Sequence, residues 1–144
     1  MNRESESLVG RYFEDILGRG NVAAAEELLA PGVTFQGLEI IEGVEDFMQY
    51  VVELHTAFPD LAFIVEDGVS DGRVAAGRYT MRGRHRGQFL GMPATNNRVE
   101  VRGISMFVTT DGRITEIWDS VDSLVLTQQI GAIPSAEGAG RSSG

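Results

Sequence analysis

The chain contains no cysteine among its 144 residues. Disulfides, thiolate nucleophiles and cysteine-ligated zinc are therefore excluded. Positive charge is also scarce, because 12 arginines and no lysine stand against 21 aspartates and glutamates, which gives a formal net charge of −9. Recognition of nucleic acid or of an anionic membrane surface depends on clustered positive charge, so we expect neither partner.

Long apolar runs are missing as well. No uninterrupted apolar stretch approaches the roughly 20 residues that a membrane-spanning helix needs. The first residues are polar and lack the apolar core of a secretory signal. Only two histidines are present, His55 and His85, and they do not have the paired spacing of a metal site. We therefore expect a cytoplasmic protein without a metal centre.

Against these absences, the chain is 42% hydrophobic, enough at this length for one globular domain with a real core. We place that domain at residues 1–132. The remaining residues, 133–144, are rich in glycine, serine and alanine, and predict a disordered tail.

The first third of the chain has helical periodicity. Apolar residues recur at a spacing of three to four over Glu4–Leu17 and over Val44–Phe58, which predicts two amphipathic helices. A third, shorter helix is predicted over Asn21–Leu29, with the asparagine as its N-cap. One strand is expected between these helices, at Val33–Leu38.

From Leu61 the pattern changes to long strands separated by turns. The predicted strands are 61–67, 73–85, 98–109 and 113–119. Asp111-Gly112 is typical of a tight hairpin, and Asp122 or Ser123 can cap a closing helix. Helices followed by an antiparallel meander predict a cone-shaped α+β barrel, with a curved antiparallel sheet packed on three N-terminal helices. The interior of such a cone is either a packed core or a ligand pocket.

Residues 115–122 combine the only tryptophan with two aspartates, where the strand pattern gives way to a helix. Side chains alternate along a strand, so Asp119 shares a face with Ile117, while Trp118 belongs to the core or to a dimer interface. A carboxylate on an apolar face is costly unless it is hydrogen-bonded, and burial raises its pKa toward values useful for proton transfer. Asp119 is thus a candidate catalytic residue; the alternative is a strand-end carboxylate bound by backbone N–H groups.

Five segments carry a resemblance to a known family: F-P-D-L at 58–61, G-R-H-R-G-Q-F-L-G-M-P-A-T at 83–95, V-E-V-R-G-I-S-M-F at 99–107, D-G-R-I-T-E-I-W-D-S-V-D at 111–122 and Q-Q-I-G at 128–131. In this order and spacing they resemble the SnoaL-like polyketide cyclases of the nuclear transport factor 2-like superfamily. The resemblance implies a homodimer without metal or organic cofactor, which acts on a small-molecule polyketide in antibiotic biosynthesis. The best-known members close a ring by an intramolecular aldol reaction, and their acid/base aspartate corresponds to Asp119.

The chain also departs from that family pattern. The aldol cyclases carry a glutamine and a histidine on the strand before the hairpin, where this sequence has Gly103 and Ser105. This departure predicts a roomier and more apolar pocket, and it leaves pericyclic ring closure open beside an aldol reaction. Other members catalyse different reactions, so a hydrolase or hydroxylase is an alternative, as is a non-catalytic small-molecule binding protein.

His85 falls on the same strand face as Tyr79 and Met81, which we assign to the cavity. An imidazole there can relay a proton, because its unperturbed pKa is about 6.5, or it can be a rim histidine bonded to the following loop. We take Asp119 and His85 as the candidate catalytic residues. The candidate substrate-binding residues are Tyr79, Met81, Phe35, Phe47, Tyr50, Phe89, Val101, Ser105, Phe107 and Gln36.

Two further features stay open at this level. Tyr12 and Tyr50 can each donate a hydrogen bond to a substrate carbonyl from a helix, or can serve as ordinary core aromatics. The opposite face of the 98–109 strand carries Ile104, Met106 and Val108, and an apolar outer face of this kind fits a sheet-to-sheet dimer.

Overall fold

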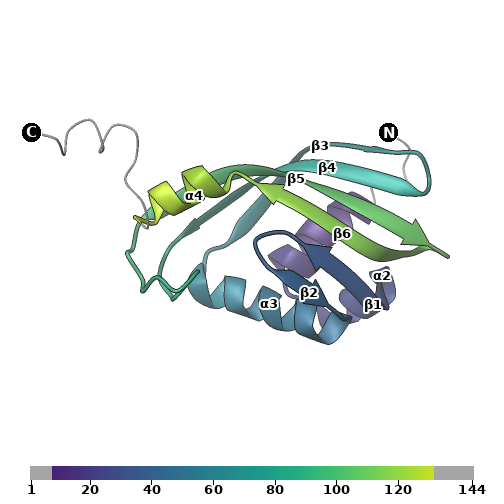
Figure 1. Cartoon of the computed structure of the whole chain (residues 1–144), viewed down its shortest axis with the longest axis horizontal. Coiled ribbons are helices and arrows are strands. Elements are labelled where there is room, and N and C mark those ends of the chain that lie inside the picture. The colour runs from purple at the N-terminus through teal and green to yellow at the C-terminus, as the bar shows by residue number, and fades with distance from the viewer. Residues whose placement is uncertain (1–7, 132–144) are drawn as a thin grey trace, which may run out of the picture.

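The computed structural model describes residues 8–131 of the chain. Its elements, in order, are η1 (Tyr12–Gly18), α2 (Val22–Leu28), β1 (Leu29–Gln36), β2 (Ile40–Glu42), α3 (Val44–Ala57), β3 (Ala62–Ser70), β4 (Val74–Arg84), β5 (Arg98–Thr110), β6 (Arg113–Val121) and α4 (Ser123–Gln129). The predicted α+β class is confirmed (Figure 1). The predicted tail, 133–144, lies outside the described residues.

One curved sheet of six strands organises the fold, in the order β2-β1-β6-β5-β4-β3. Figure 1 shows it arching over α3 and α2, with α4 near one end of β5 and β6. The meander from β3 to β6 is antiparallel, as expected, but β1 pairs with β6 in parallel. The sheet is thus mixed and not antiparallel throughout, because the meander returns its last strand beside the first. Its edges, β2 and β3, stay apart, so the predicted barrel is not closed.

The first strand differs most from the sequence pattern. It begins at Leu29, directly after α2, and not at Val33. Pro31 and Gly32 fall inside it, at the point where the pairing with β6 shifts register between Leu29 and Thr34. Proline is tolerated at such irregularities because it has no ladder hydrogen bond to give. The short strand β2 was not predicted, because three exposed or half-exposed residues carry no alternation signal.

The local signals at turns and caps are confirmed. Asp111 and Gly112 have φ values of 52° and 80°, which is the pair of positive values that a two-residue hairpin turn requires. The side chain of Asn21 accepts a hydrogen bond from the backbone N–H of Ala24, and Asp122 accepts one from Val125 in the same way. Both residues therefore cap the helices that follow them.

The first helix changes type where it reaches the core. The structure has an α-helix from Leu8 to Arg11 and a π-helix from Tyr12, where the sequence predicted one α-helix. Hydrogen bonds from residue i to residue i+5 bring side chains five apart onto nearly the same side, which an α-helix does not do. Tyr12 and Leu17 consequently both reach the interior of the cone. Apolar spacing does not distinguish the two helix types, so the sequence held no sign of this change.

The core lies between the concave face of the sheet and the helices. From α3, the predicted stripe of Phe47, Val51, Leu54 and Phe58 is buried against it. The aromatic ring of Tyr12 packs edge-on against Phe107 of β5, with 4.7 Å between ring centroids. Within residues 8–131, no helix has both the length and the apolar character needed to cross a membrane.

Candidate active site

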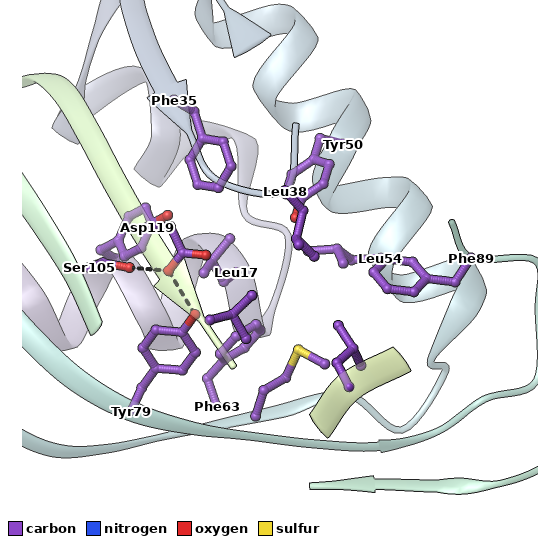
Figure 2. Close-up of a pocket in the computed structure, with 14 residues that line it drawn as sticks. Leu17, Phe35, Leu38, Tyr50, Leu54, Phe63, Tyr79, Phe89, Ser105 and Asp119 are labelled. Atoms are coloured by element: carbon purple, nitrogen blue, oxygen red, sulfur yellow. Dashed lines mark hydrogen bonds between the residues drawn. The ribbon is translucent and has the colours of Figure 1, made fainter. Parts of the chain in front are cut away.

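The interior of the cone contains a narrow cavity of about 30 Å³. Its walls are mainly aromatic and aliphatic, and they come from the sheet, from η1, from α3 and from α4 (Figure 2). The lining residues are Tyr12, Leu17, Phe35, Leu38, Tyr50, Leu54, Phe63, Tyr79, Met81, Phe89, Ser105, Asp119, Val121 and Leu126. A mostly apolar chamber with a few convergent polar groups is the usual form of a small-molecule site.

Asp119 is the polar centre of this cavity. The hydroxyl of Tyr79 donates to its Oδ1 at 2.7 Å, and the hydroxyl of Ser105 donates to the same oxygen at 2.8 Å. Figure 2 shows both bonds converging on one oxygen. Three adjacent strands thus supply one residue each to a single hydrogen-bonded group, and both donated bonds leave Oδ2 for another partner.

The strand register explains why these three side chains meet. Ser105 on β5 is directly opposite Asp119 on β6, so their side chains share a face. Tyr79 on β4 is opposite Gly103 on β5 and must cross that strand to reach Asp119. A β-carbon at position 103 would overlap the Tyr79 hydroxyl, so glycine is required for the crossing. The space expected from Gly103 is therefore filled by the tyrosine, and the pocket is apolar but not roomier at this position.

The apolar surroundings of Asp119 make its carboxylate a better proton acceptor than an exposed one. Burial raises the pKa of Asp119, and the hydrogen bonds from Tyr79 and Ser105 offset part of that rise. The described residues that line the cavity include no lysine, arginine or histidine. A carboxylate without a cationic partner is more basic than an exposed one, and this property suits a group that must take a proton from carbon.

Three tyrosines line the same cavity as the carboxylate: Tyr12, Tyr50 and Tyr79. Burial is the largest cause that raises the pKa of each, and the charge of Asp119 raises all three further. They therefore remain protonated at neutral pH, and each hydroxyl is available as a hydrogen-bond donor. Tyr79 uses its donor on Asp119.

A second, outer cavity of about 350 Å³, partly open to solvent, adjoins the first through shared residues. The shared residues are Leu38, Tyr50, Leu54 and Phe89. Its outer wall belongs to the connection between β4 and β5. We call residues 86–97 of this connection the rim loop. A tight turn at Leu90 and Gly91, with φ values of 51° and 75°, forms the tip of this loop. The entrance is acidic, because Glu39 and Glu53 line it.

His85 does not face the cavity, so our assignment of this residue to the cavity face was wrong. Its Nδ1 lies 2.9 Å from the Thr95 hydroxyl, and its backbone N–H donates to the carbonyl of Asn97. The ring packs on Phe58, and burial lowers its pKa, which favours a neutral imidazole. The alternative interpretation fits the geometry: His85 closes the base of the rim loop and lies away from Asp119.

The substrate-binding candidates divide into two groups. Six of them line the inner cavity: Phe35, Tyr50, Tyr79, Met81, Phe89 and Ser105. Four do not. Phe47, Val101 and Phe107 are buried in the core behind the cavity wall, and Gln36 points to the other face of the sheet, beside Trp118.

Six apolar lining residues were not among the candidates: Leu17, Leu38, Leu54, Phe63, Val121 and Leu126. Of these, Val121 carried a usable signal, because it has the same strand parity as Asp119. The others come from helices, from a loop or from the edge strand β3, where the sequence pattern does not distinguish cavity lining from packed core. Residues 8–131 contain no cluster of three or more histidine, aspartate or glutamate side chains that could hold a metal ion.

Comparison with known proteins gives a consistent result. The sequence profile of the SnoaL-like polyketide cyclases matches residues 7–130. Aklanonic acid methyl ester cyclase DauD of Streptomyces sp. (strain C5) is 33% identical over 106 residues, which cover 73% of this chain and 65% of that protein, slightly less than two thirds of its length. The corresponding cyclase DnrD of Streptomyces peucetius is 32% identical, with 73% and 72% covered. The structure of TsrD from Streptomyces laurentii superposes with a TM-score of 0.82 at 28% identity, over 92% of this chain and 99% of that one.

The crossing of Tyr79 over Gly103 yields a stability prediction. Gly103→Ala should destabilise the protein by about 1–3 kcal/mol, because the new methyl group displaces the tyrosine from Asp119. Chemical denaturation of the variant measures this loss. In a Tyr79→Ala background the same substitution should cost little, since the overlapping group is gone.

Gly32→Ala is the matched control, because a β-carbon at this strand position meets no atom within 4 Å. A loss at position 103 that persists at full size without the Tyr79 side chain would contradict the proposed overlap.

Asp119 itself should limit stability at neutral pH. Its pKa is raised in the folded state, so the stability contributed by its proton is present below the unfolded pKa of about 3.9 and is lost as pH rises through the folded pKa. Asp119→Asn keeps an oxygen for Tyr79 and Ser105 but carries no charge. We expect its melting temperature to exceed that of the wild type by a few degrees at pH 8, with the gain fading by pH 4.

Scanning calorimetry across this pH range tests the expectation, with Asp122→Asn as the control at an aspartate outside the cavity that caps α4. An Asp119→Asn variant that is less stable than the wild type at pH 8 would show that the charged carboxylate is stabilised in the fold.

Proposed function

We propose, from the premise that this chain belongs to the SnoaL-like polyketide cyclase family, that it is an enzyme that closes a carbon ring in a neutral polyketide-derived intermediate, with Asp119 as acid and base. One observation carries the proposal: a carboxylate faces an apolar cavity, accepts two hydroxyl hydrogen bonds on one oxygen, and has a pKa raised by burial without any cation in the cavity lining. The relatives named as ring-closing cyclases support the reaction class.

The chemistry needs no redox step. The Asp119 carboxylate takes a proton from a carbon next to a carbonyl group, and the electron pair left behind forms an enolate. The enolate carbon then attacks a ketone carbon of the same chain, which forms the new carbon–carbon bond and an alkoxide. Asp119 returns its proton to that alkoxide, so the product is an isomer of the substrate. A raised pKa helps both proton transfers, because the best acid/base groups titrate near the working pH.

The apolar walls would contribute by folding the substrate. Phe35, Phe63 and Met81 line the inner cavity together with Asp119 and offer no competing polar contacts. Holding the two reacting carbons in line can lower a barrier by roughly 7–11 kcal/mol in the best-oriented cases. If the ring closes by a pericyclic route, this positioning carries the reaction and Asp119 only orients the chain.

The charges at the entrance favour an uncharged substrate. Glu39 and Glu53 line the outer cavity, Asp119 lies within the inner one, and the described lining of both lacks a lysine or arginine. A free carboxylate would have to pass two acidic groups and lose its hydration without a partner, which is strongly unfavourable. The two curated relatives are named for a methyl ester, a group that carries no charge where the free acid would be a carboxylate.

The test is incubation of the purified protein with aklanonic acid methyl ester, followed by mass spectrometry and NMR. We expect an isomeric ring-closed product. Asp119→Asn should lower kcat by about 10²–10⁴-fold, the usual contribution of one acid/base group. In the wild type kcat/KM should rise with pH through the raised pKa of Asp119, so the acidic limb should lie above about pH 3.9, the ordinary value.

Asp122→Asn is the control, and it should turn over at the wild-type rate. Ring closure that falls less than tenfold in Asp119→Asn would keep the cyclase and remove proton transfer by this residue from the mechanism. A product that is heavier by one oxygen, or retention of the ester without reaction, would contradict the proposed function.

We further propose that the outer face of the sheet forms a homodimer. Ile104 is 52% exposed, and Met106 and Trp118 are each 41% exposed, so the alternative that Trp118 belongs to the core was wrong. Met106 and Trp118 are direct partners across β5 and β6, which makes the patch continuous. Contiguous exposed apolar side chains on a sheet face are typical of an interface with another copy.

Ile104→Glu should convert the dimer to a monomer, because it places a charge in the centre of the proposed contact. Light scattering coupled to size exclusion at micromolar concentration measures the state. Val52→Glu is the control, because Val52 is 55% exposed on α3, away from this face. A wild-type protein that elutes as a monomer would overturn the dimer.

A further inference from the structure

We propose that Tyr12 donates a hydrogen bond from its hydroxyl to the substrate carbonyl oxygen that becomes negatively charged during ring closure. This inference rests on the proposed cyclisation and assigns the oxygen partner that the reaction needs. Asp119 removes the proton from carbon, and the tyrosine hydroxyl stabilises the enolate oxygen that results. Tyr12 keeps its own proton throughout, so the atoms and charges of the reaction are unchanged.

The first observation is an unused donor in the cavity lining. The Tyr12 side chain has no exposed surface, and its hydroxyl has no hydrogen-bond partner among the described residues. Buried hydroxyl groups are normally paired, because an unpaired one gives up its hydrogen bonds to water without replacement. The only other orphan of this kind among the described side chains is Nε2 of His85, which does not line the cavity.

The second observation is that the ring is fixed in place. Tyr12 packs edge-on against Phe13 at 4.9 Å and against Phe107 at 4.7 Å, and it stacks on Phe47 at 6.2 Å, measured between ring centroids. Three aromatic neighbours prevent the side chain from turning to find a partner elsewhere. A donor that is held rigidly before the substrate binds needs no reorganisation as charge develops, and this is the property that makes oxyanion donors effective.

The third observation is the position of Tyr12 relative to Asp119. Tyr12 and Asp119 line the same inner cavity, and the charge of Asp119 adds to the burial that raises the pKa of Tyr12. No hydrogen bond joins them, since the carboxylate receives its two donors from Tyr79 and Ser105. The substrate carbon that loses a proton and the oxygen that gains the charge are two bonds apart, so they require two neighbouring groups that are not bonded to each other.

The π-helix is the local feature that delivers the side chain. Tyr12 is its first residue, and the widened turn places Tyr12 and Leu17 together in the cavity lining. Widened turns of this sort are frequent at functional sites. The sequence offered two readings of Tyr12, a donor to a substrate carbonyl and an ordinary core aromatic, and the unpartnered hydroxyl favours the first.

The test compares Tyr12→Phe with the wild type, because this change removes only the hydroxyl. With the methyl ester as substrate, kcat should fall by about 10²-fold and KM should change little, since the bond to the neutral carbonyl is weak and strengthens as charge develops. The melting temperature should stay the same or rise, because the variant removes an unpaired buried group. The acidic limb of the pH profile should keep its position, because Tyr12 is not bonded to Asp119.

Tyr79→Phe is the contrast variant. It removes a hydrogen bond that lowers the pKa of Asp119, so its acidic limb should move to higher pH. Wild-type kcat in Tyr12→Phe would overturn the inference, as would a fall in activity accompanied by an equal loss of stability, which is the mark of a packing role.

A binding measurement separates the inference from the proposed function. In the Asp119→Asn background, infrared difference spectra of the bound methyl ester should show a carbonyl stretch shifted to lower frequency. Adding Tyr12→Phe should reverse that shift. An unchanged band would overturn the role of Tyr12 even if the wild type cyclises the ester, whereas a reversed band with no cyclisation by the wild type would reject the cyclase and leave the hydrogen bond in place.

Discussion

The two hydrogen bonds that Asp119 receives allow a carboxyl group to exist in a cavity that would otherwise reject it. The surrounding walls are apolar and supply no cation, so the charged form is disfavoured by burial. The hydroxyls of Tyr79 and Ser105 recover part of that loss and also fix the carboxyl plane, since both act on the same oxygen. The sheet must hold three strands in one register to bring these groups together, and β5 must lack a side chain at Gly103 where the tyrosine crosses.

Strand alternation predicted this hydrogen-bonded group, because the face on which each strand residue lies follows from the pleat alone. Asp119, Ser105 and Tyr79 each lie on the face that the two-residue period assigns to the interior. The same period failed to separate Phe107 and Val101 from the true lining, because parity fixes the face of a sheet but not the depth at which helices cover it. Phe107 does not line the cavity because the Tyr12 ring packs against it. That contact joins residues far apart in the chain, so the sequence pattern does not show it.

The remaining errors have different physical causes. The period that placed His85 beside Tyr79 extends one residue past the end of β4, where the backbone turns to bond with Asn97 and the ring follows it into the base of the rim loop. Leu17 reaches the cavity only because the first helix widens, and its apolar spacing suits either helix type. The glycine and serine that distinguish this chain from the aldol cyclases signalled a change in the pocket, but the sequence did not show that a tyrosine from the next strand would occupy the space.

The absence of a cation from the described cavity lining constrains how such a site can work. An enolate needs its oxygen stabilised, and here the available groups are neutral hydroxyls whose pKa values burial and the charge of Asp119 raise. Tyrosines in that state can donate hydrogen bonds but cannot supply a proton and recover it within a turnover. In the proposed mechanism Asp119 is then the one proton carrier, and the proton it removes from carbon is the proton it returns to oxygen. A single carrier suits reactions in which the proton that is taken up is also returned, and an intramolecular ring closure meets that condition.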